Sequence, residues 1–177
     1  VKSLKSDTKP KTPWLDEAAL ERLTAVLEKD KDGDWRVRRD RLCVLLFVGI
    51  GWRRSEIARM RWEDFSEGFK SVTGVVKGGK KATAVVPEWL RAELLGWSLV
   101  CGAAHRELSP GPLLPRCKSI NDLVQGRSKL SISDSYAYDI VKAVARRAGF
   151  PPEAVTPHGL RRTLITLSGE RGVSLKD

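Results

Sequence analysis

Apolar positions recur with the period of an α-helix along most of the chain. Between Asp16, a suitable N-cap, and the charged turn at 30–34, leucines and valines fall on one helical face. A second helical run begins at Trp35 with a basic half and continues as the sequence CVLLFVGIG, in which Gly49 and Gly51 end the helix. Because this stretch is apolar on every side, it predicts a helix in the middle of the core.

Further along, the pattern changes from helix to hairpin and back to helix. Valines flank Gly78-Gly79, a pair that favours a tight turn, and Pro87 stops the second strand. This predicts a β-hairpin within residues 65–87 and leaves room for one more short strand before it. The segment 102–130 is rich in Pro, Gly and Ser and is expected to be irregular. Helices are predicted at 53–62, 88–100 and 133–148 and after the capping pair Thr156-Pro157. The chain as a whole predicts a mainly α-helical domain with a small antiparallel β-sheet, the α+β class.

The composition adds a strong positive charge. The 177 residues include 32 Lys and Arg against 22 Asp and Glu, a formal net charge of +10. Such a charge favours a polyanionic partner, most simply nucleic acid, although a soluble basic protein without that partner has the same composition. The longest apolar run, 42–51, is about half of what a bilayer requires, and residues 1–12 lack the apolar stretch of a signal peptide. Three scattered cysteines without metal-ligand spacing are typical of a reducing compartment.

Two basic clusters lie at special points of this predicted fold. In GWRRSE, Arg53 starts a helix directly after a buried one ends, where it is well placed to hold a phosphate, and Glu56 can orient its guanidinium. In VVKGGKK, Lys77, Lys80 and Lys81 surround a two-glycine turn that can carry a lysine into a groove. Taken alone, each cluster is also what a solvated surface carries.

A third basic cluster, TPHGLRRT, opens the last predicted helix. His158 and Arg161 are three residues apart, so they share a helix face, and both lie in the first turn, where an anion is favoured. A histidine beside an arginine at an anion site suggests proton transfer next to a phosphate. The alternative is a histidine that only caps or packs.

In this order, the three clusters resemble the boxes of the tyrosine recombinase (phage integrase) family. GWRRSEIARMRWEDF is similar to that family's first arginine box, VVKGGKKATAVVP to its lysine hairpin, and TPHGLRRT to its H-x-x-R box. The apolar LLFVGIG before the first box and the segment Leu113-Leu114-Pro115 agree with the resemblance. It covers roughly residues 14–175 and implies the fold of the recombinase catalytic domain.

The resemblance implies that the chain cuts and rejoins DNA strands. Arg53 and Arg161 would clamp the phosphate, Glu56 would occupy the acidic position of the first box, and His158 would handle the proton of an attacking tyrosine. A 3′-phosphotyrosyl bond would form while a 5′-hydroxyl leaves. No metal or other cofactor is implied. The implied partner is double-stranded DNA, on which the full-length protein would form a tetrameric synapse, in the cytoplasm at the nucleoid.

The hairpin lysine and the DNA-backbone contacts follow from the same resemblance. Lys77 matches the lysine that protonates the leaving oxygen. Because Pro87 falls later after Lys77 than in the family pattern, Lys80 is an alternative catalytic lysine. Contacts with the DNA backbone are expected for Arg54, Lys80, Lys81 and Arg162.

One part of the family pattern has no counterpart in the chain. The nucleophilic tyrosine of the family follows the H-x-x-R box, whereas Tyr136 and Tyr138 precede it and are expected to be packing or helix-surface residues. We therefore expect a C-terminally truncated catalytic domain at 14–177 without its nucleophile, and a basic linker at 1–13 from a missing N-terminal DNA-binding domain. The alternatives are a non-enzymatic DNA-binding module that retains the recombinase fold, and a relative of type IB topoisomerases, against which the integrase-like boxes argue.

Overall fold

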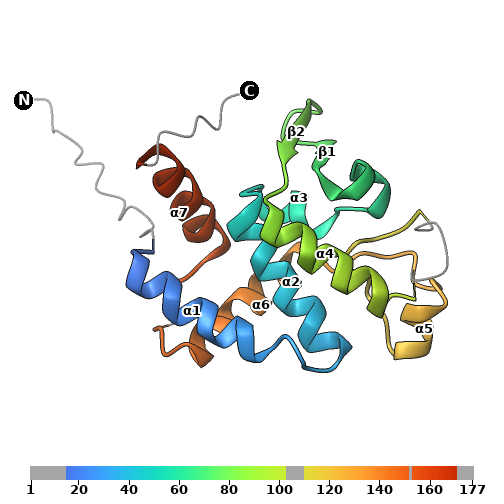
Figure 1. The fold of residues 1–177 in the computed structure, drawn as a ribbon, viewed down its shortest axis with the longest axis horizontal. Helices are drawn as coiled ribbons and strands as arrows, with labels where there is room; N and C mark the ends of the chain where they lie inside the picture. The colour runs from blue at the N-terminus through green and yellow to red at the C-terminus, as the bar shows by residue number, and fades with distance from the viewer. Residues whose placement is uncertain (1–14, 103–109, 152, 171–177) are drawn as a thin grey trace, which may run out of the picture.

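The structure, a computed structural model, describes residues 15–102, 110–151 and 153–170, so the linker expected at 1–13 lies outside it. Helix α2 (Trp35–Gly49) runs through the middle of the molecule (Figure 1). Three long helices pack against it, and α1 (Glu17–Lys29) packs against one of them, α6. These three are α4 (Glu88–Val100), α6 (Asp134–Arg147) and α7 (Pro157–Glu170). No described helix is long and apolar enough to cross a membrane.

The apolar half of α2 is the centre of the core, as predicted. Leu42, Cys43, Val44, Leu46 and Phe47 are each 2% exposed or less. Burial of a large apolar side chain contributes about 1.5–3 kcal/mol, so this helix supplies much of the folding free energy. The mainly helical class with one small antiparallel sheet is confirmed.

The basic half of α2 is also partly buried, which the sequence pattern does not reveal. The Arg41 guanidinium pairs with Glu93 of α4, and its Nε donates to the carbonyl of Leu27 in α1 at 2.7 Å. Arg39 is bonded to its neighbour Asp40 and donates to the Tyr136 hydroxyl of α6 at 3.0 Å. These two arginines therefore join α2 to three other helices.

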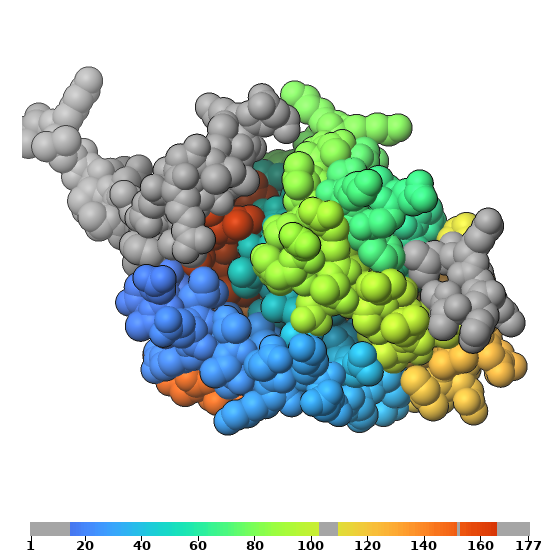
Figure 2. Space-filling view, in the orientation of Figure 1, coloured from blue at the N-terminus to red at the C-terminus, as the bar shows by residue number. Residues whose placement is uncertain are grey.

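The β-hairpin lies where it was predicted. Strands β1 (Ser71–Val75) and β2 (Lys81–Val85) pair in antiparallel fashion and, in Figures 1 and 2, the tip between them projects from the body. Gly78 and Gly79 have φ of 87° and 76°, which glycine adopts without steric cost. In place of the extra strand predicted before the hairpin, a single β-bridge joins Phe65 to Val72. Between these two residues, a 3-10 turn, η2 (Glu67–Phe69), leads into β1.

The helix predicted at 53–62 is much shorter than expected. It comprises only α3 (Arg54–Ala58), and a 3-10 turn, η1 (Trp62–Asp64), follows it. The intervening backbone pairs with the segment 111–113 instead: the N–H of Trp62 donates to the carbonyl of Gly111, and the N–H of Leu113 to that of Met60, both at 2.9 Å. Tertiary hydrogen bonds thus replace helical ones.

The segment 102–130 is not wholly irregular, because it contains a short helix, α5 (Ile120–Val124). The Ser119 hydroxyl caps it by accepting the N–H of Asp122 at 3.1 Å. The other predicted helices are confirmed to within about one or two residues, the usual uncertainty of helix ends.

The turn after α2 lies directly against α7. Gly51 has φ of +68°, and a Cβ atom added to it would lie 2.6 Å from Cδ2 of Leu164 in α7. Helix α7 is further fixed by Thr163, whose hydroxyl accepts the N–H of Leu15 at 2.8 Å and donates to the carbonyl of Gly159 at 3.0 Å. Through Leu164, the middle of α7 therefore packs against the turn that leads to Trp52 and Arg53.

We predict that Gly51→Ala destabilises the protein more than Gly149→Ala does. Gly149, after α6, has φ of +75°, and a Cβ there would meet nothing within 4 Å, so its substitution reports backbone strain alone. That strain is about 1–2 kcal/mol. Gly51→Ala adds the clash with Leu164, at a further cost of about 1–3 kcal/mol. Urea unfolding of both variants measures the difference, and equal losses would show that α7 does not press on this turn.

Candidate phosphate-binding site

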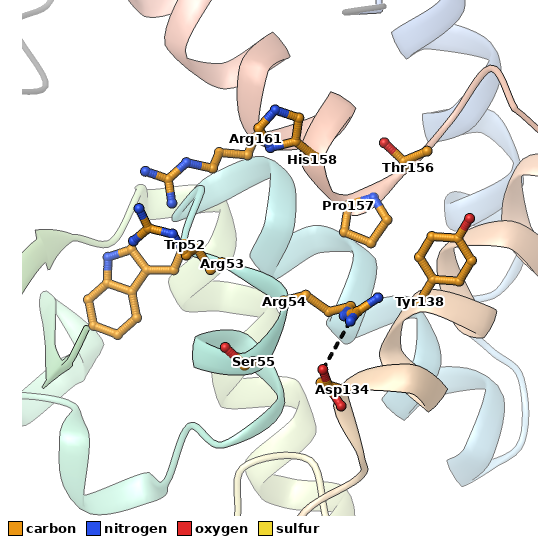
Figure 3. Close-up of a pocket in the computed structure, with 10 residues that line it drawn as sticks. All are labelled: Trp52, Arg53, Arg54, Ser55, Asp134, Tyr138, Thr156, Pro157, His158 and Arg161. Atoms are coloured by element: carbon orange, nitrogen blue, oxygen red, sulfur yellow. Dashed lines mark hydrogen bonds and ion pairs between the residues drawn. The ribbon is translucent and has the colours of Figure 1, made fainter. Parts of the chain in front are cut away.

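A pocket of about 310 Å³ lies where the N-terminus of α3 meets the starts of α6 and α7 (Figure 3). The sequence clusters around Arg53 and Arg161, which are far apart in the chain, both supply its walls. Its lining residues are Trp52, Arg53, Arg54, Ser55, Asp134, Tyr138, Thr156, Pro157, His158 and Arg161.

Arg53 is held at the N-terminus of α3 by the buried carboxylate of Glu56. Its backbone N–H donates to Oε2 of Glu56 at 2.7 Å, and its guanidinium Nη1 lies 3.3 Å from Oε1. The Arg53 side chain is 49% exposed, whereas that of Glu56 is 4% exposed. The carboxylate thus orients a guanidinium that still faces the pocket.

His158 and Arg161 reach the pocket from the first turn of α7. The Thr156 hydroxyl caps this turn by accepting the N–H of Gly159 at 2.9 Å, which confirms the capping expected from the sequence. Figure 3 shows the guanidinium groups of Arg53 and Arg161 on the same side of the pocket. Two cations that converge at two helix N-termini form a setting that favours a phosphate.

Glu56 also ties the hairpin to Arg53. Its Oε1 accepts the backbone N–H of Lys77 at 3.1 Å. Burial by itself would raise the pKa of the Glu56 carboxyl, but the N–H groups of Arg53 and Lys77 and the Arg53 guanidinium lower the pKa below its ordinary value of 4.5. The carboxylate therefore stays charged and joins the two basic clusters.

The predicted lysines do not line the arginine pocket. Lys77 lines a neighbouring groove of about 620 Å³, which shares Trp52, Arg53 and Ser55 with the pocket. Lys80 and Lys81 are exposed at the hairpin tip and line neither cavity. Arg162 is half-buried and also lies outside both. The structure thus brings Arg53, His158 and Arg161 together, and connects Lys77 to them only through Glu56 and Arg53.

Arg54 and both tyrosines have partners within the protein. Nη2 of Arg54 lies 3.0 Å from Oδ2 of Asp134, and its guanidinium carbon lies 5.7 Å from the centre of the Tyr138 ring. The Tyr136 hydroxyl accepts a hydrogen bond from Arg39 on α2, outside the pocket. Tyr138 does line the pocket, but in Figure 3 it lies across it from the guanidinium groups of Arg53 and Arg161.

Trp52, Asp134 and Tyr138 line the pocket but were not predicted as site residues. Asp134 and Tyr138 are four residues apart on α6, so the sequence does place them on one helix face. Which face turns towards α3 depends on helix packing, which the sequence pattern does not give. Within the described ranges, no three His, Cys, Asp or Glu side chains gather as metal ligands.

We predict that Glu56→Gln frees the hairpin. A glutamine has one acceptor oxygen in place of two charged ones, and the lost charge-assisted hydrogen bonds are worth about 1.5–3 kcal/mol. The amide of Lys77 should therefore exchange its hydrogen about tenfold to a hundredfold faster, as measured by hydrogen exchange. Glu88→Gln, at an exposed position at the start of α4, is the matched control.

The hydrogen bond between the Lys77 N–H and the Glu56 carboxylate should also depend on pH in the unchanged protein. Because the pKa of Glu56 is lowered on folding, its stabilising effect is complete above the ordinary value of 4.5 and is lost as the pH falls through the lower pKa of the folded state. Glu56→Gln should lack this dependence. Identical hydrogen-exchange rates of the Lys77 amide in both proteins at all pH values would show that Glu56 does not hold the hairpin.

Known proteins resemble this chain over nearly its whole length. The model of the "Phage integrase family" matches residues 13–177. Tyrosine recombinase XerA of Pyrococcus furiosus is 34% identical over 173 residues, which cover 96% of this chain and 51% of XerA. XerA of Thermococcus kodakarensis is 30% identical over 141 residues, which cover 78% of this chain and 44% of XerA. The chain thus spans about half the length of these relatives.

Solved structures show the same fold. A crystal structure of XerA recombinase matches with a TM-score of 0.69 and 19% identity, over 93% of this chain and 53% of that one. XerH site-specific recombinase bound to its difH substrate, in a pre-cleavage complex, matches with a TM-score of 0.67 and 21% identity, over 92% of this chain and 44% of that one. The boxes, the fold and the matched family model lead to one conclusion: the chain belongs to the phage integrase family.

Proposed function

We propose that this chain is the DNA-binding catalytic domain of a site-specific tyrosine recombinase, which cuts and rejoins DNA strands through a 3′-phosphotyrosyl intermediate. The observation that supports this most is the pocket in which Arg53, His158 and Arg161 meet. A phosphodiester in this pocket would contact two guanidinium groups, each able to donate several hydrogen bonds.

In the proposed reaction, a tyrosine oxygen attacks the phosphorus and the bond from phosphorus to the 5′ oxygen breaks. The tyrosine gives its proton to His158, and the departing 5′ oxygen receives one from Lys77, or from Lys80 as the alternative. Arg53 and Arg161 stabilise the extra negative charge of the transition state, because they are in place before it forms. The new phosphotyrosyl ester keeps the energy of the old ester, so the reverse steps rejoin a strand.

Other residues have supporting roles in this proposal. Glu56 is a positioning residue that orients Arg53 and holds the backbone of Lys77. Contacts with the DNA backbone are assigned to Arg54, Lys80, Lys81 and Arg162. Arg54 would exchange its exposed ion pair with Asp134 for a phosphate, and this is easy because such pairs contribute only about 0–1 kcal/mol.

The wider setting of the domain follows from the same proposal. Residues 14–177 form a catalytic domain whose attacking tyrosine lies outside the 177 residues, and 1–13 link it to a further DNA-binding domain. The full-length protein assembles as a tetramer on duplex DNA, in the cytoplasm at the nucleoid.

We predict that the chain binds duplex DNA with a steep dependence on salt. Each phosphate neutralised contributes about −0.9 to the slope of log Kobs against log salt concentration. Arg161→Ala should weaken binding at least about tenfold, since a hydrogen bond to a charged group is worth about 1.5–3 kcal/mol. The matched control is Arg146→Ala, at an exposed position in the last turn of α6 and outside the pocket. Fluorescence anisotropy measures both. A slope near zero, or equal effects of the two substitutions, would refute the proposed site.

A second prediction concerns the nucleophile. The 177-residue chain should form no covalent adduct with a nicked duplex on a denaturing gel, because Tyr136 is engaged by Arg39 and Tyr138 lies across the pocket from the arginines. The full-length protein should form one on its own recombination site. An adduct of the 177-residue chain that disappears with Tyr138→Phe would show that the attacking residue has been misassigned. If the full-length protein formed none, a module that only binds DNA would be the better description.

A further inference from the structure

The groove beside the arginine pocket is only partly used by the proposed reaction. It measures about 620 Å³, twice the volume of the pocket itself. Residues 52–64 form one side and the hairpin from Gly74 to Gly78 forms the other. Of its cations, Arg53 and Lys77 already have proposed roles, whereas Arg59 and Arg61 have none.

Trp52 makes the groove and the pocket one continuous surface. Its ring lies so close to the hairpin that a Cβ atom on Gly74 would be 2.7 Å from Cζ3 of the indole. Because Gly74 has no side chain, the half-buried ring can rest on the backbone of β1 and form a wall shared by both cavities. The pocket at Arg53 is therefore adjacent to the groove, and the two share lining residues.

The charges of the groove favour an anion at Arg59. Its Nε donates to the carbonyl of Ser55 at 2.8 Å, which leaves both Nη groups to other acceptors, and among the described residues it has no ion-pair partner. The two carboxylates that line the groove are occupied: Glu56 is buried with three donors, and Asp64 accepts the N–H of Arg61 at 2.8 Å. Arg61 itself pairs with Glu63. Arg59 is thus the best-placed phosphate ligand.

We propose that this groove holds a second phosphate of the DNA backbone, next to the one between Arg53 and Arg161, with Arg59 as its main ligand. The inference rests on the proposed function. A DNA strand carries a phosphate every 3.4 Å along the helix axis, so a strand held at Arg53 necessarily brings another phosphate nearby. Lys77, the proposed donor to the departing oxygen, lines the same groove, which places the departing nucleotide and the phosphate after it on this side.

The test is a double-mutant cycle read from salt slopes of binding to duplex DNA. Arg59→Ala should reduce the steepness of the slope by about 0.9, the value for one phosphate. Arg59→Lys, which keeps the charge, should leave the slope close to that of the unchanged protein. Arg59→Ala with Arg161→Ala should lose about twice as much as either single variant, because two separate phosphates give additive effects. Arg146→Ala is the control for the loss of one positive charge.

Each outcome decides between the two proposals. If Arg59→Ala behaves like Arg146→Ala while Arg161→Ala has its full effect, the second phosphate site is wrong and the proposed function stands. If the double variant loses no more than Arg161→Ala alone, both arginines serve one phosphate and the inference also fails. If neither the unchanged protein nor any variant shows a salt slope, the proposed function fails with it.

Discussion

The close approach of α7 to the Gly51 turn is the contact on which the candidate site depends. Arg53 and Arg161 are far apart in sequence, and they share a pocket where the Leu164 side chain of α7 packs on Gly51, in the turn after the central helix. A Cβ atom at Gly51 would force the Leu164 side chain of α7 to shift. The proposed reaction requires phosphate donors that are fixed in advance, so under that proposal the absence of a methyl group at Gly51 bears directly on the chemistry.

The net charge of +10 does not by itself locate the proposed DNA-binding site, because many of the cationic side chains have partners within the fold. Arg41 and Arg39 are buried and join α2 to its neighbours. Arg147 pairs with Asp30 at 2.5 Å, and Arg22 lies over the ring of Phe150. Because removal of one partner from a buried pair costs about 3–5 kcal/mol, Arg39 and Arg41 are structural. In the proposals above, the phosphate ligands are instead the cations of the arginine pocket, of the groove beside it and of the hairpin.

The parts of the fold that were predictable from the sequence have local causes. Caps at Asp16, Ser133 and Thr156 and the two-glycine turn act within a few residues, so their signals are visible in the sequence. The break after Ala58 is invisible locally because its cause, pairing with 111–113, is a tertiary contact. Helix α5 was missed although its Ser119 cap was present, because the glycines and prolines around it outweighed that signal.

The site was predictable to a similar extent. The box motifs identified Arg53, His158 and Arg161, which do share a pocket. They did not show that Lys77 opens into a separate groove, or that Tyr138 faces the pocket while Tyr136 turns to α2. Side chains two residues apart on a helix point in different directions, and only the packing of α6 decides which one meets the site.

A buried carboxylate beside a proposed phosphate site needs a physical explanation, since like charges repel. Glu56 receives three donors, from the N–H and guanidinium of Arg53 and the N–H of Lys77, and so its charge is largely compensated within the protein. Arg53 can serve both sides because a guanidinium has five N–H donors: Nη1 faces Glu56, and the remaining donors are available to a ligand. A lysine at this position would have one ammonium group for two acceptors and no planar fork for a phosphate. The arginine and the carboxylate therefore form one unit, in which the carboxylate fixes the position of the guanidinium.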